Sequence, residues 1–460
     1  MSLTTPKLER GLSLRHAIAL NMTDMVGIGP FIAIPFVVDA MNGPICLIAW
    51  VLGAILAFAD GLVWSELGAA MPAAGGSFVF LRETYGKEKW GSLMSFLYIW
   101  QTVIQAPLVI ASGAIGFSQY FGYLVHLETW QQKAVAGALV ILLIIILYRK
   151  ITTVGKISVV LWTCVIATLV WVIFGGLTHF HSELIIPDLT KDFTLSAVFF
   201  AGLGQASVKT IYCYLGYYNI CHLGEEIKDP QRNIPRSILF SIFGIAIIYL
   251  LMQVAVMGAI PWQEIRKSEF IVSTFFERIY GSNAAIFATA LILVIAASSL
   301  FSAILGYSRI PYAAAKDGKF FSIFARLHPR LNFPHTSLLI LGGIAFIFSL
   351  LFKLKEVITA IIVMRILIQF VGQSVGLILW RRKVGKSKLP FKMWLYPIPV
   401  IIAISVWIYI FFSVDVIYML YAGIVILVGI LLFLAWANVN RKWPYQEVAP
   451  PELLDSETRM

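Results

Sequence analysis

Long apolar runs, separated by short polar segments, occupy most of the chain. Each run is close to the length of about 20 helical residues that crosses a hydrocarbon core of roughly 30 Å. The pattern predicts an all-α polytopic membrane protein with twelve transmembrane helices. The predicted helices cover residues 16–40, 44–70, 91–121, 131–148, 154–177, 194–224, 236–258, 284–316, 336–353, 356–380, 395–413 and 416–437.

Composition agrees with a membrane protein. Of the 460 residues, 59% are apolar and 13% are charged, whereas a typical soluble domain carries about 25% charged residues. The first 16 residues are polar, so no cleavable signal peptide is predicted and the first span stays in the mature chain. The four cysteines all fall in apolar segments and indicate packing, with neither a disulfide framework nor a metal site.

The net charge of +11 follows from the orientation of the chain. With both termini in the cytoplasm, 26 of the 35 lysines and arginines lie on the cytoplasmic side, 7 lie outside and 2 fall within spans. Cytoplasmic loops of membrane proteins carry such an excess of basic residues. The basic charge therefore does not require a nucleic-acid partner, and the predicted location is the plasma (inner) membrane.

Two of the predicted spans contain residues that interrupt a helix. The first reads NMTDMVGIGPFIAIPF, with Gly27, Gly29 and Pro30 in its middle, and the sixth reads KTIYCYLGYYNICHLGEE, with Gly216 among tyrosines. Glycine costs a helix interior about 1 kcal/mol and proline about 3 kcal/mol. A simple kink is one interpretation. The other is local unwinding, which a membrane tolerates only where the backbone lines a cavity.

Breaks in spans one and six occupy corresponding places in two five-helix halves, a pattern typical of secondary transporters built from inverted repeats. The predicted organisation is a cytoplasmic N-terminus, a first repeat of helices 1–5, a second repeat of helices 6–10, two further helices and a cytoplasmic C-terminus. These parts cover residues 1–15, 16–177, 194–380, 395–437 and 438–460. Backbone N–H groups freed at such breaks suit a substrate carboxylate, and freed carbonyls suit an ammonium group.

Five motifs at these and neighbouring positions resemble those of the amino acid–polyamine–organocation (APC) superfamily of permeases, which have the leucine-transporter fold. Gly27-Ile28-Gly29-Pro30-Phe31 is similar to the family's G-S-G-I-F break, although Pro30 departs from it. Tyr212-Cys213-Tyr214-Leu215-Gly216-Tyr217 resembles the break in helix six. The other three motifs are Trp64-Ser65-Glu66-Leu67-Gly68, the segment from Glu225 to Pro235, and the segment from Ser308 to Pro329.

The resemblance implies a secondary active amino acid transporter without a cofactor, in which helices 1, 2, 6 and 7 rock against a scaffold of helices 3, 4, 5, 8, 9 and 10. It implies that the two breaks bind the substrate, and that Tyr212 closes the site from outside, although a plain packing role for Tyr212 stays open. The implied binding residues are Gly27, Ile28, Gly29, Pro30, Phe31, Tyr212, Cys213, Tyr214 and Gly216.

The candidate coupling residues lie near the first break. Lys156 opens the fifth span, where sodium-independent relatives resemble this chain in having a lysine in place of sodium. A buried lysine can lose its proton near neutral pH and so couple transport to protons, whereas an exposed one would only orient the helix. Asp24 is close enough in sequence to the break to pair with Lys156. Ser298 and Ser299 are candidates for a sodium site or for structural hydrogen bonds.

Charges inside the membrane mark function or an ion pair. Lys209 lies one turn before Tyr212, and is expected either to face the substrate route or to pair with Asp60 on the second span. Arg365 in the tenth span is expected to close an outer gate against Asp39.

Other classes of protein remain as alternatives or are excluded. A permease for polyamines or organic amines is the second candidate, but Lys209 would repel a polycation. A non-transporting nutrient sensor on the same fold is the third, and no pore motif favours a channel. The sequence contains no phosphate-binding loop or metal cluster, so no enzyme activity is predicted. The substrate, the choice between proton symport, sodium coupling and exchange, and the oligomeric state stay open.

Overall fold

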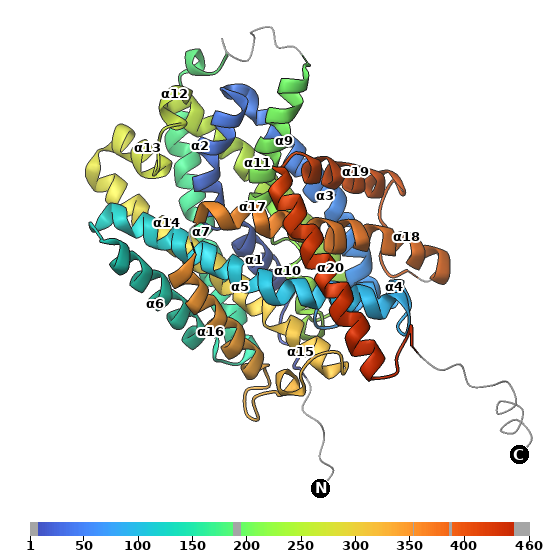
Figure 1. Cartoon of the computed structure of the whole chain (residues 1–460). Helices are drawn as coiled ribbons and strands as arrows, with labels where there is room; N and C mark the ends of the chain where they lie inside the picture. Colours follow the sequence, from blue (N-terminus) through green and yellow to red (C-terminus); the bar gives the residue numbers. More distant parts are fainter. Residues whose placement is uncertain (1–7, 187–194, 353, 386–388, 446–460) are drawn as a thin grey trace, which may run out of the picture.

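The computed structural model describes residues 8–186, 195–352, 354–385 and 389–445, and in this part the chain is helical, with two isolated β-bridges and no strand (Figure 1). The prediction of an all-α polytopic membrane protein is confirmed. Within the predicted cytoplasmic termini, residues 1–7 and 446–460 lie outside the described residues, as do the loop residues Lys191 and Lys353.

The first nine elements begin with a helix pair that is bent at a short break. The helices are α1 (Leu14–Met25), α2 (Gly29–Met41), α3 (Leu47–Ala70), α4 (Ser77–Thr84), α5 (Trp90–Leu124), α6 (Thr129–Leu147) and α7 (Ile151–Thr178), with the 3-10 turns η1 (Pro44–Cys46) and η2 (Ser182–Leu184).

The second part of the chain also begins with an interrupted helix. The elements up to the scaffold helices are α9 (Ala197–Tyr214), α10 (Asn219–His222), η3 (Gly224–Glu226), α11 (Pro230–Ala259), α12 (Trp262–Ile265), α13 (Ile271–Tyr280), α14 (Ser282–Tyr307), α15 (Arg309–Lys316) and η4 (Ser322–Ala325). They are followed by α16 (His335–Leu351), α17 (Leu354–Arg365), η5 (Ile366–Val371), α18 (Gly372–Val384), α19 (Ile398–Phe412) and α20 (Val416–Val439).

Among the described residues, eight helices are long and apolar enough to cross a membrane, and the bent pair α1–α2 makes a ninth span. Two shorter apolar helices, α16 and α19, add to these. The protein is therefore an integral membrane protein, while the count of twelve spans and the inverted repeat stay predictions. The predicted span 284–316 corresponds to one candidate span, Ser282–Lys316, in which α14 and α15 are separated by Ser308 alone.

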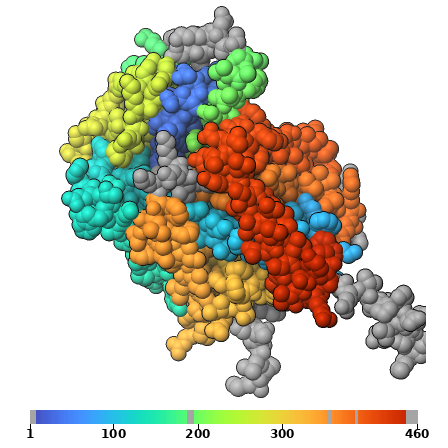
Figure 2. Space-filling view, viewed as in Figure 1, coloured from blue at the N-terminus to red at the C-terminus, as the bar shows by residue number. Residues whose placement is uncertain are grey.

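The broken helices lie at the centre of the bundle. α1 packs against α7, α11 and α14, and α2 packs against α9, so both halves of the first span are surrounded by protein. Figure 2 shows the C-terminal helices, coloured orange to red, covering one face of the molecule. Because the irregular backbone at the breaks is enclosed in this way, its polar groups are kept from lipid.

The tenth predicted span contains a π-helical turn. α17 ends at Arg365, η5 covers Ile366–Val371 with π-helical hydrogen bonding, and α18 continues from Gly372. Such turns hold an extra residue within a helix and are frequent at functional sites. The turn begins directly after the intramembrane Arg365.

Candidate functional site

The first break follows from local sequence. α1 ends at Met25, α2 begins at Gly29, and the two helices are bent by 44°. Pro30 lies in the first turn of α2, where a missing N–H leaves no intrahelical bond unmade. A Cβ on Gly27 would come within 2.6 Å of the Ser299 hydroxyl, and one on Gly29 within 3.0 Å of the Tyr212 ring. Both glycines are thus required by close approach of other helices.

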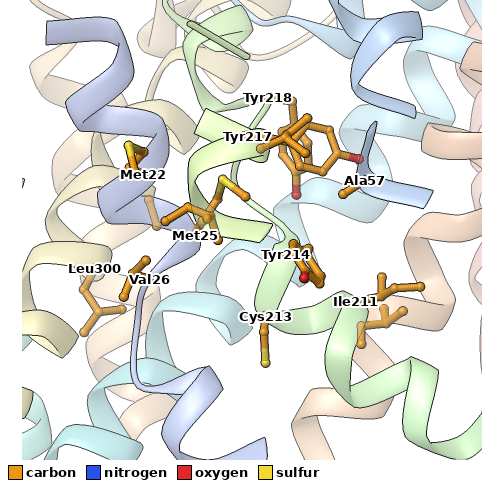
Figure 3. Close-up of a cluster of buried hydrophobic side chains, with 14 of the residues drawn as sticks. Met22, Met25, Val26, Ala57, Ile211, Cys213, Tyr214, Tyr217, Tyr218 and Leu300 are labelled. Atoms are coloured by element: carbon orange, nitrogen blue, oxygen red, sulfur yellow. The ribbon is translucent and has the colours of Figure 1, made fainter. Parts of the chain in front are cut away.

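The second break depends on a backbone conformation that favours glycine. α9 ends at Tyr214, and Gly216 has a φ of +119° before α10 begins at Asn219. A Cβ on Gly216 would lie 2.8 Å from the backbone nitrogen of Met25 in the first break. Figure 3 shows the segment from Cys213 to Tyr218 beside Met22, Met25 and Val26 of the first span. The two breaks therefore lie against each other.

Polar side chains tie the broken segments together. The Tyr249 hydroxyl on α11 donates a hydrogen bond to the carbonyl of Met25 (2.8 Å), and the carbonyl of Cys213 lies 3.2 Å from the same hydroxyl. Asn219 donates to the carbonyl and hydroxyl oxygens of Ser302 on α14, at 2.8 and 2.9 Å. These bonds replace those that the unwound backbone loses, which explains how the breaks persist in a buried place.

A cavity of about 70 Å³ lies at the junction of the two breaks. Both breaks contribute to its lining, and α5, α14 and α17 complete it. The lining residues used below are Asp24, Gly27, Ile28, Gly29, Tyr212, Cys213, Gly216, Ser299, Tyr307 and Arg365. Tyr212 also lines a smaller neighbouring cavity together with Lys209 and Phe36.

Three of the predicted binding residues do not line the main cavity. Pro30 and Phe31 are buried in the first turn of α2. The Tyr214 hydroxyl donates to the carbonyl of Trp50 on α3 (3.3 Å), so its side chain points away from the cavity. These side chains hold the break in place. Consecutive residues at an interrupted helix point in different directions, so a motif alone does not tell which of them face the substrate.

The expected burial of Lys156 is wrong. Its side chain is exposed on α7, and the neighbouring Gly155 packs against Leu12 and His16 instead. Among the described residues, Asp24 forms no ion pair with Lys156. The exposed position of Lys156 fits the other interpretation of this residue, that of a lysine which orients the helix.

The two other expected ion pairs are not formed either. Asp60 accepts hydrogen bonds from Tyr217 and from Trp64, the latter at 2.9 Å. Lys209 lies at another level of α3: its neighbour in sequence, Thr210, lies beside Gly53 of α3. Since Asp60 is seven residues further along α3, it is displaced by about 10 Å along the helix axis.

Asp39 pairs with Arg266 across 3.2 Å instead of with Arg365. Arg266 directly follows α12, in the segment between α11 and α13. Arg365 is 2% exposed, and its guanidinium donates to Gln369 (2.7 Å) and to the Tyr307 hydroxyl (3.3 Å). Its ring contacts are with Tyr218 and Phe370.

The serines of α14 use their hydroxyls in helix contacts. Ser298 donates to the carbonyl of Val294 one turn back, at 2.6 Å. Ser299 donates to the carbonyl of Asp24 at 3.1 Å, and Ser302 donates to that of Leu20 at 2.6 Å. Ser299 and Ser302 therefore join α14 to α1, and no group of three or more metal-ligating side chains occurs in the described part of the chain.

Two buried ion pairs were not identified from the sequence. Glu226 in η3 accepts two hydrogen bonds from Arg309 at 2.8 and 2.9 Å, and Glu66 on α3 accepts two from Arg381 on α18, one of them at 2.6 Å. The Arg309–Glu226 side chains are 2% and 0% exposed. Glu66, Glu226 and Arg309 all lie in the three further motifs, so these motifs could have indicated the ion pairs. Counting basic residues on each side of the membrane explains the arginines by the orientation of the chain alone.

The comparisons with known proteins match nearly the whole chain. The family model described as amino acid permease matches residues 12–448. The chain belongs to this family of transporters, which are not enzymes. It is 26% identical over 441 residues to the serine/threonine exchanger SteT of Bacillus subtilis, covering 92% of this chain and 95% of that protein.

Two further relatives have other named substrates. The chain is 22% identical over 448 residues to the methylthioribose transporter of Bacillus subtilis, covering 94% of each. It is 25% identical over 369 residues to the human cationic amino acid transporter 4, covering 76% of this chain and 56% of that protein.

Proposed function

We propose that this protein is a secondary active transporter of amino acids that works by alternating access, as a proton symporter or an exchanger and without sodium. The observation that carries the proposal is the cavity at the junction of the two helix breaks. The start of α2 lies at this cavity, and the first N–H groups of a helix have no intrahelical partner. The relatives named as amino acid transporters or exchangers support the same substrate class.

The proposed independence of sodium follows the structural interpretation of the serines. Ser298 donates to a carbonyl of its own helix and Ser299 donates to the carbonyl of Asp24 on α1, as serines in membrane helices commonly do. Of the two coupling candidates, Asp24 lines the cavity and Lys156 is exposed on α7.

The charges at the cavity disfavour the amine alternative. Asp24 and Arg365 both line it, so a zwitterion matches the two groups, whereas the second ammonium group of a polyamine would face the like charge of Arg365. The proposed orientation has both termini in the cytoplasm and the proposed location is the plasma membrane, because the basic residues gather in the loops on one side.

The test is flux through the purified protein in proteoliposomes. Uptake of radiolabelled alanine, serine, leucine and glutamate is measured in potassium and in sodium buffer, with and without an inward proton gradient, and with unlabelled amino acid inside. Accumulation or counterflow in potassium buffer supports the proposal, and spermidine uptake in place of amino acid uptake contradicts it. Binding without any flux would assign the chain to the sensors.

A matched pair of glycine variants ties the flux to the cavity. Gly29→Val places a side chain against the Tyr212 ring, which lies 3.0 Å from the position of the first added carbon. Gly423→Val adds the same group to α20, where nothing lies within 4 Å. We expect the first variant to lose uptake and the second to retain it.

A further inference from the structure

Two groups of opposite charge, the partly buried Asp24 and the buried Arg365, face the same cavity without forming an ion pair. Asp24 lies in the last turn of α1 and lines the cavity, and in the described part of the chain its carboxylate oxygens have no hydrogen-bond or ion-pair partner. Arg365 lines the same cavity from α17. Ionisable groups without a partner are costly within a membrane, so a pair of opposite sign retained at one cavity indicates a function.

The guanidinium of Arg365 is held in place with one group unused. Gln369 and Tyr307 accept from Nε and Nη1, whereas Nη2 is buried and has no partner. The aromatic rings of Tyr218 and Phe370 lie 5.1 and 5.3 Å from its central carbon. The side chain is thus fixed by neighbours that leave a donor free, which is the arrangement expected of a carboxylate-binding arginine.

The sequence of the first break adds a reason for a side-chain ligand. Backbone N–H groups at the start of α2 would be the ordinary partners of a carboxylate there. Pro30 lies in that turn and has no N–H, so one of these donors is missing. A guanidinium across the cavity supplies donors of the same kind. Asp24, in turn, adds a carboxyl group to the end of α1, where the carbonyl groups already favour a cation.

We propose that Asp24 binds the ammonium group of the substrate and Arg365 binds its carboxylate, so that the site selects a zwitterion by two side-chain charges. The inference rests on the proposed function and names the recognition at the same cavity. Each charge of the ligand pairs with one group of opposite sign at the cavity. A ligand with only one of the two charges leaves either Asp24 or Arg365 unpaired, which is the costly case.

The test compares each amino acid with analogues that lack one charge. Binding of alanine, serine, leucine and glutamate to the purified full chain is measured by isothermal calorimetry, together with binding of their α-methyl esters and of the matching 2-hydroxy acids. For the wild type we expect both analogues of a bound amino acid to bind at least about tenfold more weakly, the loss typical of a hydrogen-bonded charge.

The variants should remove these preferences one at a time. Arg365→Met is expected to weaken binding of the amino acid at least about tenfold and to leave binding of its methyl ester nearly unchanged. Asp24→Asn is expected to weaken the amino acid and to leave the hydroxy acid nearly unchanged. Asp39→Asn and Lys156→Met change exposed charges outside the cavity and should keep the wild-type pattern. Thermal unfolding of each variant checks that it is folded.

Failure of the proposed function and failure of this inference give different binding results. If the wild type binds none of the amino acids, the proposed function fails and this inference fails with it. If the wild type binds an amino acid but the variants weaken amino acid and analogue equally, the inference alone is overturned. If Arg365→Met weakens binding of glutamate alone, the inference is also overturned. It is overturned as well if Asp24→Asn keeps the preference for the ammonium group and loses only the response of transport to a proton gradient.

Discussion

The buried Glu226–Arg309 pair offers a direct test of alternating access. Glu226 ends η3, which follows the second break and α10, and Arg309 begins α15, so the pair fastens the broken segment to a neighbouring helix. If the substrate leaves past this point, the pair must separate in each cycle. We predict that Glu226→Gln shifts the protein toward the state in which this side is open.

The magnitude follows from the geometry. Removing one partner of a buried ion pair costs about 3–5 kcal/mol. The lower end applies here, because Arg309 also donates to Ser308 at 2.9 Å and to the carbonyl of Leu305 at 3.3 Å, and the glutamine oxygen can still accept one bond. About 3 kcal/mol corresponds to a shift of roughly a hundredfold in the equilibrium between closed and open states, at about 1.4 kcal/mol for each factor of ten.

Cys221 is a native reporter of this opening. It is buried in α10, between the second break and Glu226. With Cys46, Cys164 and Cys213 replaced by alanine, the rate of labelling by N-ethylmaleimide measures how often Cys221 is exposed. We expect at least tenfold faster labelling in Glu226→Gln than in the parent protein.

The neighbouring glutamate provides the control. Glu225 pairs with Lys316 at 3.3 Å, and the two side chains are 29% and 55% exposed. Such a surface pair contributes only about 0–1 kcal/mol, so Glu225→Gln should label at nearly the parent rate. Equal labelling of the two variants would refute the reasoning, because it would show that the buried pair does not hold the closed state.

Three further predictions concern other parts of the fold. Gly216→Ala should reduce uptake more than about tenfold, since a Cβ would lie 2.8 Å from backbone at a φ of +119°, while Gly343→Ala, with nothing within 4 Å, should transport normally. Ser302→Ala removes the hydroxyl that joins α14 to α1, and the free energy of unfolding in detergent should fall by about 1–3 kcal/mol; an unchanged Tm would contradict this. Burial lowers the pKa of Lys319 to about 8, from 10.5 in the unfolded chain, so the unfolded state binds more protons between these values and stability should rise with pH across that window. Thermal unfolding should show this rise in the wild type and not in Lys319→Met.

The sequence predicts the helix breaks well because their cause is local. Glycine and proline at Gly27, Gly29, Pro30 and Gly216 act on the backbone of their own turn, and the structure has both breaks there. It predicts less well which side chains face one another. α7 is apolar on all sides, so its composition does not fix which face is buried, and a rotation of about 100° per residue separates exposed Lys156 from buried Gly155.

Partners of charged residues depend on segments that carry no periodic signal. Asp39 is reached by Arg266 from the short helices between α11 and α14, a region whose fold the hydrophobic pattern does not predict. Asp60 was expected to need a cation, but hydrogen bonds from Trp64 and Tyr217 take that place. A tyrosine or tryptophan looks apolar in a hydropathy pattern, and only the structure reveals its donor.

The π-helical turn after Arg365 sets the rotational register of α18 relative to α17. An α-helix advances by about 100° per residue, so the extra residue in Ile366–Val371 lets α17 and α18 present faces that one continuous α-helix could not present together. Arg365 faces the cavity, while Gln373, beyond the turn, accepts from the Ser77 hydroxyl at 2.6 Å. Deleting one residue here would straighten the helix and force a choice between these contacts. The chain length of this segment, as much as its composition, is therefore under constraint.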